Sequence, residues 1–327
     1  MAALLPELFF PISDPQKTRA MFKACVERVM VETSSYCNRR CSYCPTAQVD
    51  RFTKRDYMPD RMRDKIAAEL AEIDYEKTIV LHFYNEPLAD ERICEHIALF
   101  ARACPKAKVE LFSNGDYLDA EYLQRLADAG LKSLWISMHL GNNVEWKDEL
   151  IIRRLCQLAM RLGVLPDVSI FWSNMVLQAV LPHPTIEIKI SHKNFPRFGG
   201  SDRAGSVSNV VINDTTKEAG FTCFIPFSEL YVSWNGTVVP CCDIHPELAM
   251  HSDYRIGRIN DFPDIFAAFA SEKLVQWRTS LADRSGYRKP CDTCQTKICN
   301  PTLRDQVGNF YQAVSDLQRQ AAHSAVA

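Results

Sequence analysis

Cys37-Asn38-Arg39-Arg40-Cys41-Ser42-Tyr43-Cys44 places three cysteines in one short loop, shortly after the apolar run 29–31. Three thiolates so close in sequence can bind three irons of a cubane cluster and leave the fourth iron open. Structural zinc prefers four ligands, usually as two separated Cys-x-x-Cys pairs. This loop therefore predicts an open iron–sulfur site in preference to a zinc knuckle.

Apolar strand-like runs alternate with amphipathic helix-like runs through the first two-thirds of the chain. This alternation indicates parallel βαβ units with right-handed crossovers. About six such units fit before residue 200, fewer than the eight of a closed barrel. We therefore expect an α/β fold, a partial (β/α)6 TIM-like barrel, with the cysteine loop after the first strand, where such barrels carry active sites. The expected strands cover 29–31, 78–83, 108–112, 133–138, 168–172 and 187–190, and the expected helices cover 58–73, 91–103, 119–129 and 148–162.

The alternation of strand-like and helix-like runs ends in the Gly- and charge-rich stretch 194–205, which we interpret as a linker. We therefore divide the chain into a barrel domain, 1–205, and a smaller domain, 206–327. The dipeptide Asn235-Gly236 between two apolar runs is a strong signal for a two-residue hairpin turn. The elements expected in the smaller domain are strands over 229–234 and 237–240 and helices over 262–281 and 306–322.

The smaller domain carries a second group of cysteines. Cys223 precedes the hairpin and Cys241 ends it, so the tight turn brings both thiols toward one metal. Cys291 and Cys294 add a Cys-x-x-Cys pair from the tail. Four such ligands suit a closed iron–sulfur cluster or a structural zinc site, and their spacing alone leaves both possibilities open.

The loop 37–44 resembles the signature Cys-x-x-x-Cys-x-φ-Cys of the radical S-adenosylmethionine (SAM) superfamily, in which φ is aromatic. The resemblance implies that Cys37, Cys41 and Cys44 hold a [4Fe–4S] cluster whose open iron is chelated by SAM. It further implies reductive cleavage of SAM to a 5′-deoxyadenosyl radical, which abstracts a hydrogen atom from the substrate. An external electron donor, such as flavodoxin or ferredoxin, would then be a partner.

Further motifs of the family follow the expected strands in order. Tyr43 fills the aromatic position that lies beside the adenine of SAM in the family. Tyr84-Asn85-Glu86-Pro87 stands where the family keeps a Gly-Gly-Glu-Pro-like motif for the SAM amino group, although Tyr-Asn replaces Gly-Gly here. Ser113-Asn114-Gly115 resembles the Thr-Asn-Gly turn, and Ser137 ends the fourth strand, where polar residues contact the ribose or the carboxylate. The resemblance thus implies a SAM-binding set of Tyr43, Asn85, Glu86, Pro87, Ser113, Asn114 and Ser137.

The tail resembles the SPASM/Twitch extension of the same superfamily, in which a glycine lies shortly before the second cysteine and a Cys-x-x-Cys pair follows. The resemblance implies that Cys223, Cys241, Cys291 and Cys294 hold an auxiliary [4Fe–4S] cluster. The longer SPASM form needs further cysteines for a second auxiliary cluster, and only Cys299 remains after the pair. We therefore expect the shorter Twitch form with one auxiliary cluster and a structural Cys299.

The resemblance implies oxidation of a carbinol in a small polar substrate, sugar- or aminocyclitol-like, with the auxiliary cluster as electron acceptor. Two radical alternatives stay open: an epimerase in which the Cys242 thiol returns a hydrogen atom, and a peptide-modifying maturase, although the segment before Cys37 is short for a leader-recognition domain. Otherwise Cys242 packs beside the cluster or offers redundant ligation. Outside radical enzymes, the alternatives are an iron–sulfur electron carrier and a zinc-stabilised binding protein. Candidate substrate contacts, for each of which solvation or packing is the commoner role, are His139, His192, Lys193, Arg197 and Arg203.

Composition limits the partners and the compartment. With 38 basic and 40 acidic residues the net charge is -2, which argues against a nucleic-acid partner. No run approaches the roughly 20 apolar residues of a spanning helix, and residues 1–10 lack the basic start of a signal peptide. We therefore expect a cytoplasmic protein without membrane partners, whose 13 cysteines stay reduced. Four scattered cysteines should be buried small hydrophobes: Cys25, Cys94, Cys104 and Cys156.

Overall fold

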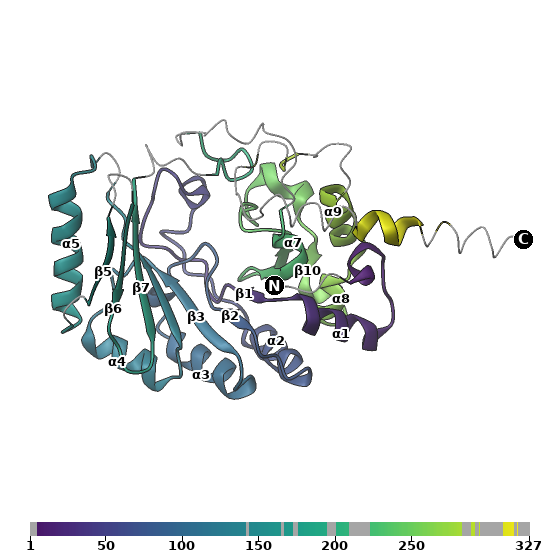
Figure 1. Cartoon of the computed structure of the whole chain (residues 1–327), viewed down its shortest axis with the longest axis horizontal. Helices are drawn as coiled ribbons and strands as arrows, with labels where there is room; N and C mark the ends of the chain where they lie inside the picture. Colours follow the sequence, from purple (N-terminus) through teal and green to yellow (C-terminus); the bar gives the residue numbers. More distant parts are fainter. Residues whose placement is uncertain are drawn as a thin grey trace, which may run out of the picture.

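One curved sheet runs through the part of the chain that the structure describes (Figure 1). The computed structural model describes residues 5–141, 144–164, 167–172, 176–194, 201–208, 223–282, 289–291, 294, 310–316 and 319. The strands in chain order are β1 (Arg28–Val31), β2 (Thr78–Val80), β3 (Lys108–Ser113), β4 (Ser133–Ser137), β5 (Asp167–Trp172), β6 (Val176–Leu181), β7 (Glu187–Lys193), β8 (Glu229–Val232), β9 (Thr237–Val239) and β10 (Gly257–Arg258).

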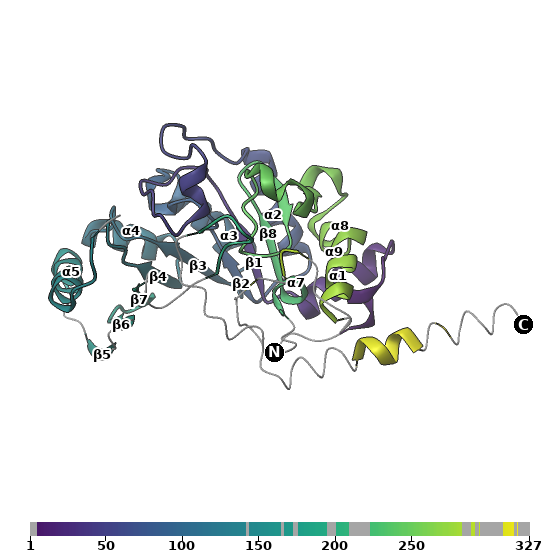
Figure 2. The same ribbon diagram turned by 90° about the horizontal axis from the view of Figure 1, so that it is seen from above.

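The sheet is an open arc. Its strand order is β10-β9-β8-β1-β2-β3-β4-β7-β6-β5, so the two end strands pair with only one neighbour each. Seen from above, the strands from β7 to β8 curve without meeting at their ends (Figure 2). This arrangement confirms the predicted α/β fold and partial barrel.

Helices cover one face of the arc, and sequence signals set their ends. The Asp119 carboxylate accepts a hydrogen bond from the Tyr122 N–H at 2.7 Å, which caps the first turn of α4. Gly130 and Gly163 follow α4 and α5 with φ of 101° and 66°, a backbone that favours glycine. The α-helices are α1 (Pro15–Cys25), α2 (Asp60–Glu72), α3 (Ile93–Ala103), α4 (Ala120–Asp128), α5 (Asp148–Arg161), α7 (Ile225–Ser228), α8 (Ile265–Phe269) and α9 (Glu272–Ala282). The 3-10 helices are η1 (Pro6–Phe9), η2 (Pro45–Gln48), η3 (Pro87–Ala89), η5 (Ala249–Tyr254) and η6 (Ile259–Asp261).

The barrel domain begins with repeated strand–helix units and then changes pattern. β1, β2, β3 and β4 are parallel neighbours, and α2, α3, α4 and α5 follow them in turn. β7 also lies parallel to β4, but β6 runs antiparallel between β7 and β5. The fifth and sixth units therefore differ from the expected repeat. The connections 173–175 and 182–186 are too short for the helical crossover that parallel strands require, and β6 is a strand that the sequence pattern does not predict.

The smaller domain extends the same sheet. β8 pairs parallel with β1 on the side opposite β2, and β8 and β9 form the predicted antiparallel hairpin. Gly236 in its turn has φ of 82°, and a Cβ there would lie 2.8 Å from Met62 Cε. The domain boundary at residue 205 stays a prediction, because 195–200 and 209–222 lie outside the described residues.

A helical layer packs beside the β8 end of the sheet (Figure 2). The expected helix 262–281 is two helices, and the break at 270–271 lets α8 pack on α1 while α9 packs on η1. The Phe22 ring of α1 meets Phe266 and Phe269 edge-on, with centroids 5.1 and 5.5 Å away. Residues 310–316 are helical, inside the expected C-terminal helix. No helix within the described residues is long and apolar enough to cross a membrane.

The scattered cysteines follow the expectation with one exception. Cys25 and Cys104 are buried, and Cys94 is half-buried. Cys156 is exposed on α5, so the prediction of a buried side chain is wrong there. The helical pattern placed the residue on α5 but on the wrong side of it.

Alternate side chains of each strand point to two separate cores. Val29, Ile79 and Val109 face the helices in the main core. Their neighbours Met30 and Val80 point to the opposite face of the sheet and belong to a second, smaller core that also includes residues of the loops. We call that second set the inner cluster: Met30, Val80, Phe83, Tyr84, Ala204, Ile225, Tyr231, Val239 and Ile244.

Candidate active site

The cysteine loop leaves the C-terminal end of β1, as predicted. The Cys37 N–H donates to the Arg51 carbonyl at 3.0 Å, and the Cys44 N–H donates to the Cys41 carbonyl at 2.9 Å, so the loop closes on itself. Burial raises the pKa of Cys37 to about 12, and the neighbouring Cys41 and Cys44 add to this. Such thiols ionise only when cationic metal compensates the charge.

Among the described residues, no three Cys, His, Asp or Glu side chains converge tightly enough to hold one metal ion. In a cubane each thiolate binds a different iron, so the sulfur atoms surround a larger volume. Cys37, Cys41 and Cys44 are all half-buried, and they lie close enough together that a thiolate at Cys41 or Cys44 raises the pKa of Cys37.

Two side chains of the loop fasten it to the turns after β3 and β4. The Tyr43 hydroxyl hydrogen-bonds His139 Nδ1 at 2.7 Å, with the rings 5.7 Å apart. Arg39 donates twice to Asp116, from Nε at 2.7 Å and Nη2 at 2.5 Å, and once to the His139 carbonyl at 3.1 Å. Burial opposes ionisation of Asp116, but the Arg39 guanidinium holds the pKa of this carboxyl below its usual range. The predicted substrate contact His139 therefore pairs with Tyr43.

Glu86 ties the loop after β2 to the end of β3. Its carboxylate accepts hydrogen bonds from Leu88 N at 3.0 Å, Ser113 Oγ at 2.7 Å and Asn114 N at 2.7 Å. Burial raises its pKa to about 7, although these bonds favour the ionised form. Pro87 begins η3 directly after it. Glu86 thus holds two predicted SAM-binding motifs together, and its own contact with SAM stays a prediction.

The other predicted SAM residues meet at the same end of the sheet. Asn85 Nδ2 donates to Ser34 Oγ at 3.2 Å, and Asn114 Nδ2 donates to Asn38 Oδ1 in the cysteine loop at 2.7 Å. Ser137 ends β4 opposite Ser191 of β7. The motifs come together around the cysteine loop, whereas their individual roles stay predictions.

The four predicted auxiliary ligands also gather. Cys223 interacts electrostatically with Cys291 and Cys294, and Cys241 interacts with Cys223 and Cys291. Burial raises the pKa of Cys223 and Cys241 well above the usual range. Four half-buried thiols in one place suit a closed cluster that neutralises them. Cys299 lies outside the described residues.

The inner cluster separates the two groups of cysteines. Cys44 packs against it from one group, and Cys241 and Cys242 pack against it from the other. The Tyr84 hydroxyl donates to the Cys242 carbonyl at 2.6 Å, so a residue of the second-strand motif touches the auxiliary side directly. Burial also raises the pKa of Cys242 to about 12.

Arg203 and Asp243 form an ion pair next to Cys242 and Tyr84. Arg203 Nη1 donates to Asp243 Oδ1 at 2.8 Å, while Asp243 Oδ2 accepts from Ser201 Oγ at 2.5 Å and Cys294 Sγ at 3.5 Å. Burial works against the guanidinium charge, but Asp243 raises the pKa of Arg203 above its usual range. Arg203 and Ala204 adopt left-handed φ of 50° and 56°, a strained backbone of the kind found at functional sites.

The remaining predicted substrate contacts lie on β7 or outside the described residues. His192 is on the face of β7 that carries Ile188 and Ile190, which belongs to the main core. Lys193 is exposed at the end of β7, and Arg197 lies outside the described residues. Sequence reasoning missed Asp243, which has no motif of its own beyond following Cys241 and Cys242.

An open α/β barrel with a three-cysteine loop after its first strand, and a second cysteine group beside it, defines a radical SAM fold with an iron–sulfur extension. Residues 31–157 match the Radical SAM superfamily, and residues 223–295 match the SPASM iron-sulfur cluster-binding domain. The chain therefore contains a radical SAM domain followed by a SPASM domain. These domains imply SAM and two [4Fe–4S] clusters, while the assignment of individual cysteines stays a prediction.

Three comparisons place the chain further. It is 24% identical over 273 residues to the S-adenosyl-L-methionine-dependent 2-deoxy-scyllo-inosamine dehydrogenase of Niallia circulans, covering 83% of this chain and 92% of that protein. The crystal structure of BtrN with AdoMet and 2-DOIA aligns with a TM-score of 0.58 at 20% identity, over 83% of this chain and 93% of that one. Selenomethionine BtrN in an open conformation aligns with a TM-score of 0.51 at 20% identity, over 84% and 92%. The two structures show a shared fold.

Proposed function

We propose that this enzyme oxidises a carbinol carbon of a small polar cyclitol, with aminocyclitols as the preferred substrate class. The observation that carries the proposal is the position of Arg203. Its guanidinium donates to Asp243 at 2.8 Å and lies near enough to Tyr84, Cys242 and Cys44 for their charges to raise its pKa. A substrate held by this guanidinium lies between the two cysteine groups. The similarity to a 2-deoxy-scyllo-inosamine dehydrogenase supports the same substrate class.

The chain supplies binding and orientation. When bound, SAM and the reduced clusters supply the radical that removes a hydrogen atom and the acceptor for the second electron. Arg203 donates hydrogen bonds to the substrate hydroxyls, and Asp243 keeps the guanidinium in place. The rings of Phe83, Tyr84 and Tyr231 pack at 4.4 to 5.1 Å and keep water away from the reacting carbon.

The test is turnover of the anaerobically reconstituted protein with SAM, dithionite and a panel of cyclitols that includes 2-deoxy-scyllo-inosamine. We expect 5′-deoxyadenosine and a ketone in equal amounts with at least one cyclitol. Arg203→Gln should raise KM about tenfold or more at unchanged iron content, because a charged hydrogen-bond donor is lost. The exposed Arg258→Gln serves as the matched control. SAM cleavage without ketone across the whole panel would refute the dehydrogenase.

Epimerisation is the second candidate, because Cys242 lies close to Arg203, the residue that we propose holds the substrate. The thiol is half-buried against the inner cluster and interacts with Arg203. In an epimerase the substrate carbon radical takes the hydrogen atom of the S–H bond. The products are the epimer and a Cys242 thiyl radical, which an external one-electron reductant and a proton return to the thiol.

Cys242→Ala separates the two candidates. An epimerase loses product formation but still cleaves SAM, and the wild type incorporates one solvent deuterium into its product in D2O. A dehydrogenase variant keeps its ketone yield and its product carries no deuterium at that carbon. Cys156→Ala, exposed on α5, is the control.

A further inference from the structure

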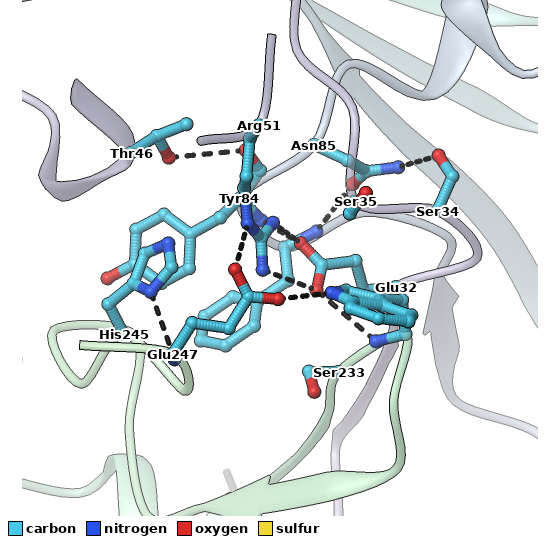
Figure 3. Close-up of polar contacts among 12 residues, drawn as sticks. Glu32, Ser34, Ser35, Thr46, Arg51, Tyr84, Asn85, Ser233, His245 and Glu247 are labelled. Carbon is cyan, nitrogen blue, oxygen red and sulfur yellow. Dashed lines mark hydrogen bonds and ion pairs between the residues drawn. The ribbon is translucent and has the colours of Figure 1, made fainter. Parts of the chain in front are cut away.

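A buried ion triad lies beside the site (Figure 3). Arg51 Nη1 donates to Glu32 Oε1 at 2.5 Å and Nη2 to Glu32 Oε2 at 3.3 Å, and both side chains are fully buried. Arg51 Nε donates to Glu247 Oε2 at 3.0 Å, with Glu247 22% exposed. One guanidinium thus serves two carboxylates that are far apart in the sequence.

The carboxylates also bind the backbone of the neighbouring segments. Glu32 Oε1 accepts the Tyr84 N–H at 2.9 Å, and Glu32 Oε2 accepts the Trp234 N–H at 3.3 Å. Glu247 accepts from the indole N–H of Trp234. The triad therefore joins the end of β1, the exit of the cysteine loop, the loop after β2, the hairpin turn and the segment after Cys241.

Two branches of the triad lead to the cysteine groups. The Arg51 carbonyl accepts the Cys37 N–H at 3.0 Å. Tyr84, held at its N–H by Glu32, donates its hydroxyl to the Cys242 carbonyl at 2.6 Å. Its ring also lies 4.4 Å from that of His245, close to Glu247 in the chain.

We propose that Glu32, Arg51 and Glu247 are positioning residues that fix the SAM-binding cysteine loop relative to the auxiliary cysteines. A buried ion pair adds little stability compared with apolar residues of the same volume, but its hydrogen bonds are directional. The proposal rests on the two clusters that the matched domains imply. Its consequence for substrate oxidation rests on the proposed function.

The test uses Glu247→Gln and Arg51→Lys in the anaerobically reconstituted holoenzyme, with Lys106→Met, in an exposed ion pair with Asp74, as control. Both triad variants should keep full iron content and the SAM-induced change in the EPR spectrum. The power saturation of the EPR signal in the doubly reduced protein, which reports the distance between the clusters, should change at least about twofold. With substrate, the ratio of 5′-deoxyadenosine to product should rise about tenfold or more, because small displacements of reacting groups are costly.

Two outcomes overturn the proposal. One is a set of variants that match wild type and Lys106→Met in both the saturation behaviour and the product ratio. The other is loss of iron or of fold in both triad variants, including the mild Glu247→Gln, which would make the triad a structural element only. If no cyclitol is oxidised, the proposed dehydrogenase function is wrong. The EPR comparison of the variants still tests whether the triad positions the two clusters.

Discussion

Acidification from about pH 7 to about pH 5.5 should destabilise this protein through two buried neutral histidines, His192 and His245. They are 2% and 0% exposed, and burial lowers their pKa values to about 4 and about 2. Among the described residues, neither His192 nitrogen has a hydrogen-bond partner, and His245 Nε2 has none. A proton added to His245 in the folded state therefore has no acceptor to stabilise it, and for His192 burial outweighs the backbone of Lys193, which favours the protonated ring.

Linkage gives the sign and the size of this effect. In the unfolded chain both rings titrate near pH 6.5. Below that pH the unfolded state therefore binds more protons than the folded state does. The stability contributed by each neutral histidine is present above pH 6.5 and is lost as the pH falls. Integrated over this window, each residue costs about 1.2 kcal/mol and the pair about 2.5 kcal/mol.

The assay is urea unfolding of the anaerobically prepared protein at a series of pH values, followed by tryptophan fluorescence. His245→Gln should reduce the loss of unfolding free energy between about pH 7 and about pH 5.5 by about 1.2 kcal/mol relative to wild type, and His192→Gln by the same amount. The double variant should combine both, because the residues lie in separate parts of the core. A pH dependence unchanged in all three variants would refute the reasoning.

Three further substitutions probe the site. Gly236→Ala forces a side chain into φ of 82°, with its Cβ 3.2 Å from Ile259 Cγ2 and 2.8 Å from the flexible end of Met62. It should cost roughly 1–2 kcal/mol. Because the hairpin carries Cys241, the iron content should fall from about eight to about four. Gly115 has φ of 74°, and a Cβ there would lie 2.8 Å from Ile136 Cγ2. Gly115→Ala should therefore weaken SAM binding in equilibrium dialysis while leaving the auxiliary cluster intact. Asp116→Asn removes a charged partner of Arg39 and should cost roughly 1–2 kcal/mol of SAM affinity, measured in the same way.

Gly163→Ala provides the control for the two glycine variants. Its φ is 66°, but a Cβ there meets nothing within 4 Å. Gly163→Ala therefore has the same backbone strain as the other two variants but no close contact at its Cβ. Equal iron content and equal SAM affinity in all three glycine variants would contradict the importance of the close contacts, and an Asp116→Asn affinity equal to wild type would contradict the fastening of the cysteine loop.

Features that depend on a few neighbouring residues could be predicted from the sequence, whereas features that depend on long-range strand pairing could not. Asn235-Gly236 predicts the hairpin because the turn chemistry is contained in two residues, and Gly130 marks a helix end for the same reason. The pattern over 168–172 and 187–190 predicts strands but not their direction, which depends on connection length and pairing partners. The joining of β8 to β1 depends on segments some 200 residues apart and has no local signal.

The residues of the site also fall into those that local sequence signals predict and those that only long-range contacts bring together. The cysteine spacing and the motifs after β2 and β3 stand within short stretches, so the chemistry could be predicted from them. The contact between Arg51 and Glu247 spans 196 residues, and only the folded chain brings the two together. A charged residue directly after a buried strand, as Glu32 is, was the one available hint of a buried network.

The parallel pairing of β8 with β1 decides where this protein can be recombined. Register runs from Arg28 opposite Glu229 to Val31 opposite Val232. A chimera cut near residue 206 takes β8 away and leaves β1 with a bare edge of main-chain donors and acceptors, open to association with another chain. A chimera joined at the Asn235-Gly236 turn keeps β8 with the barrel and exchanges only the residues C-terminal to the turn. A chimera cut inside the hairpin also leaves Cys223 with the barrel, so a new cluster extension must supply ligands that fit this cysteine.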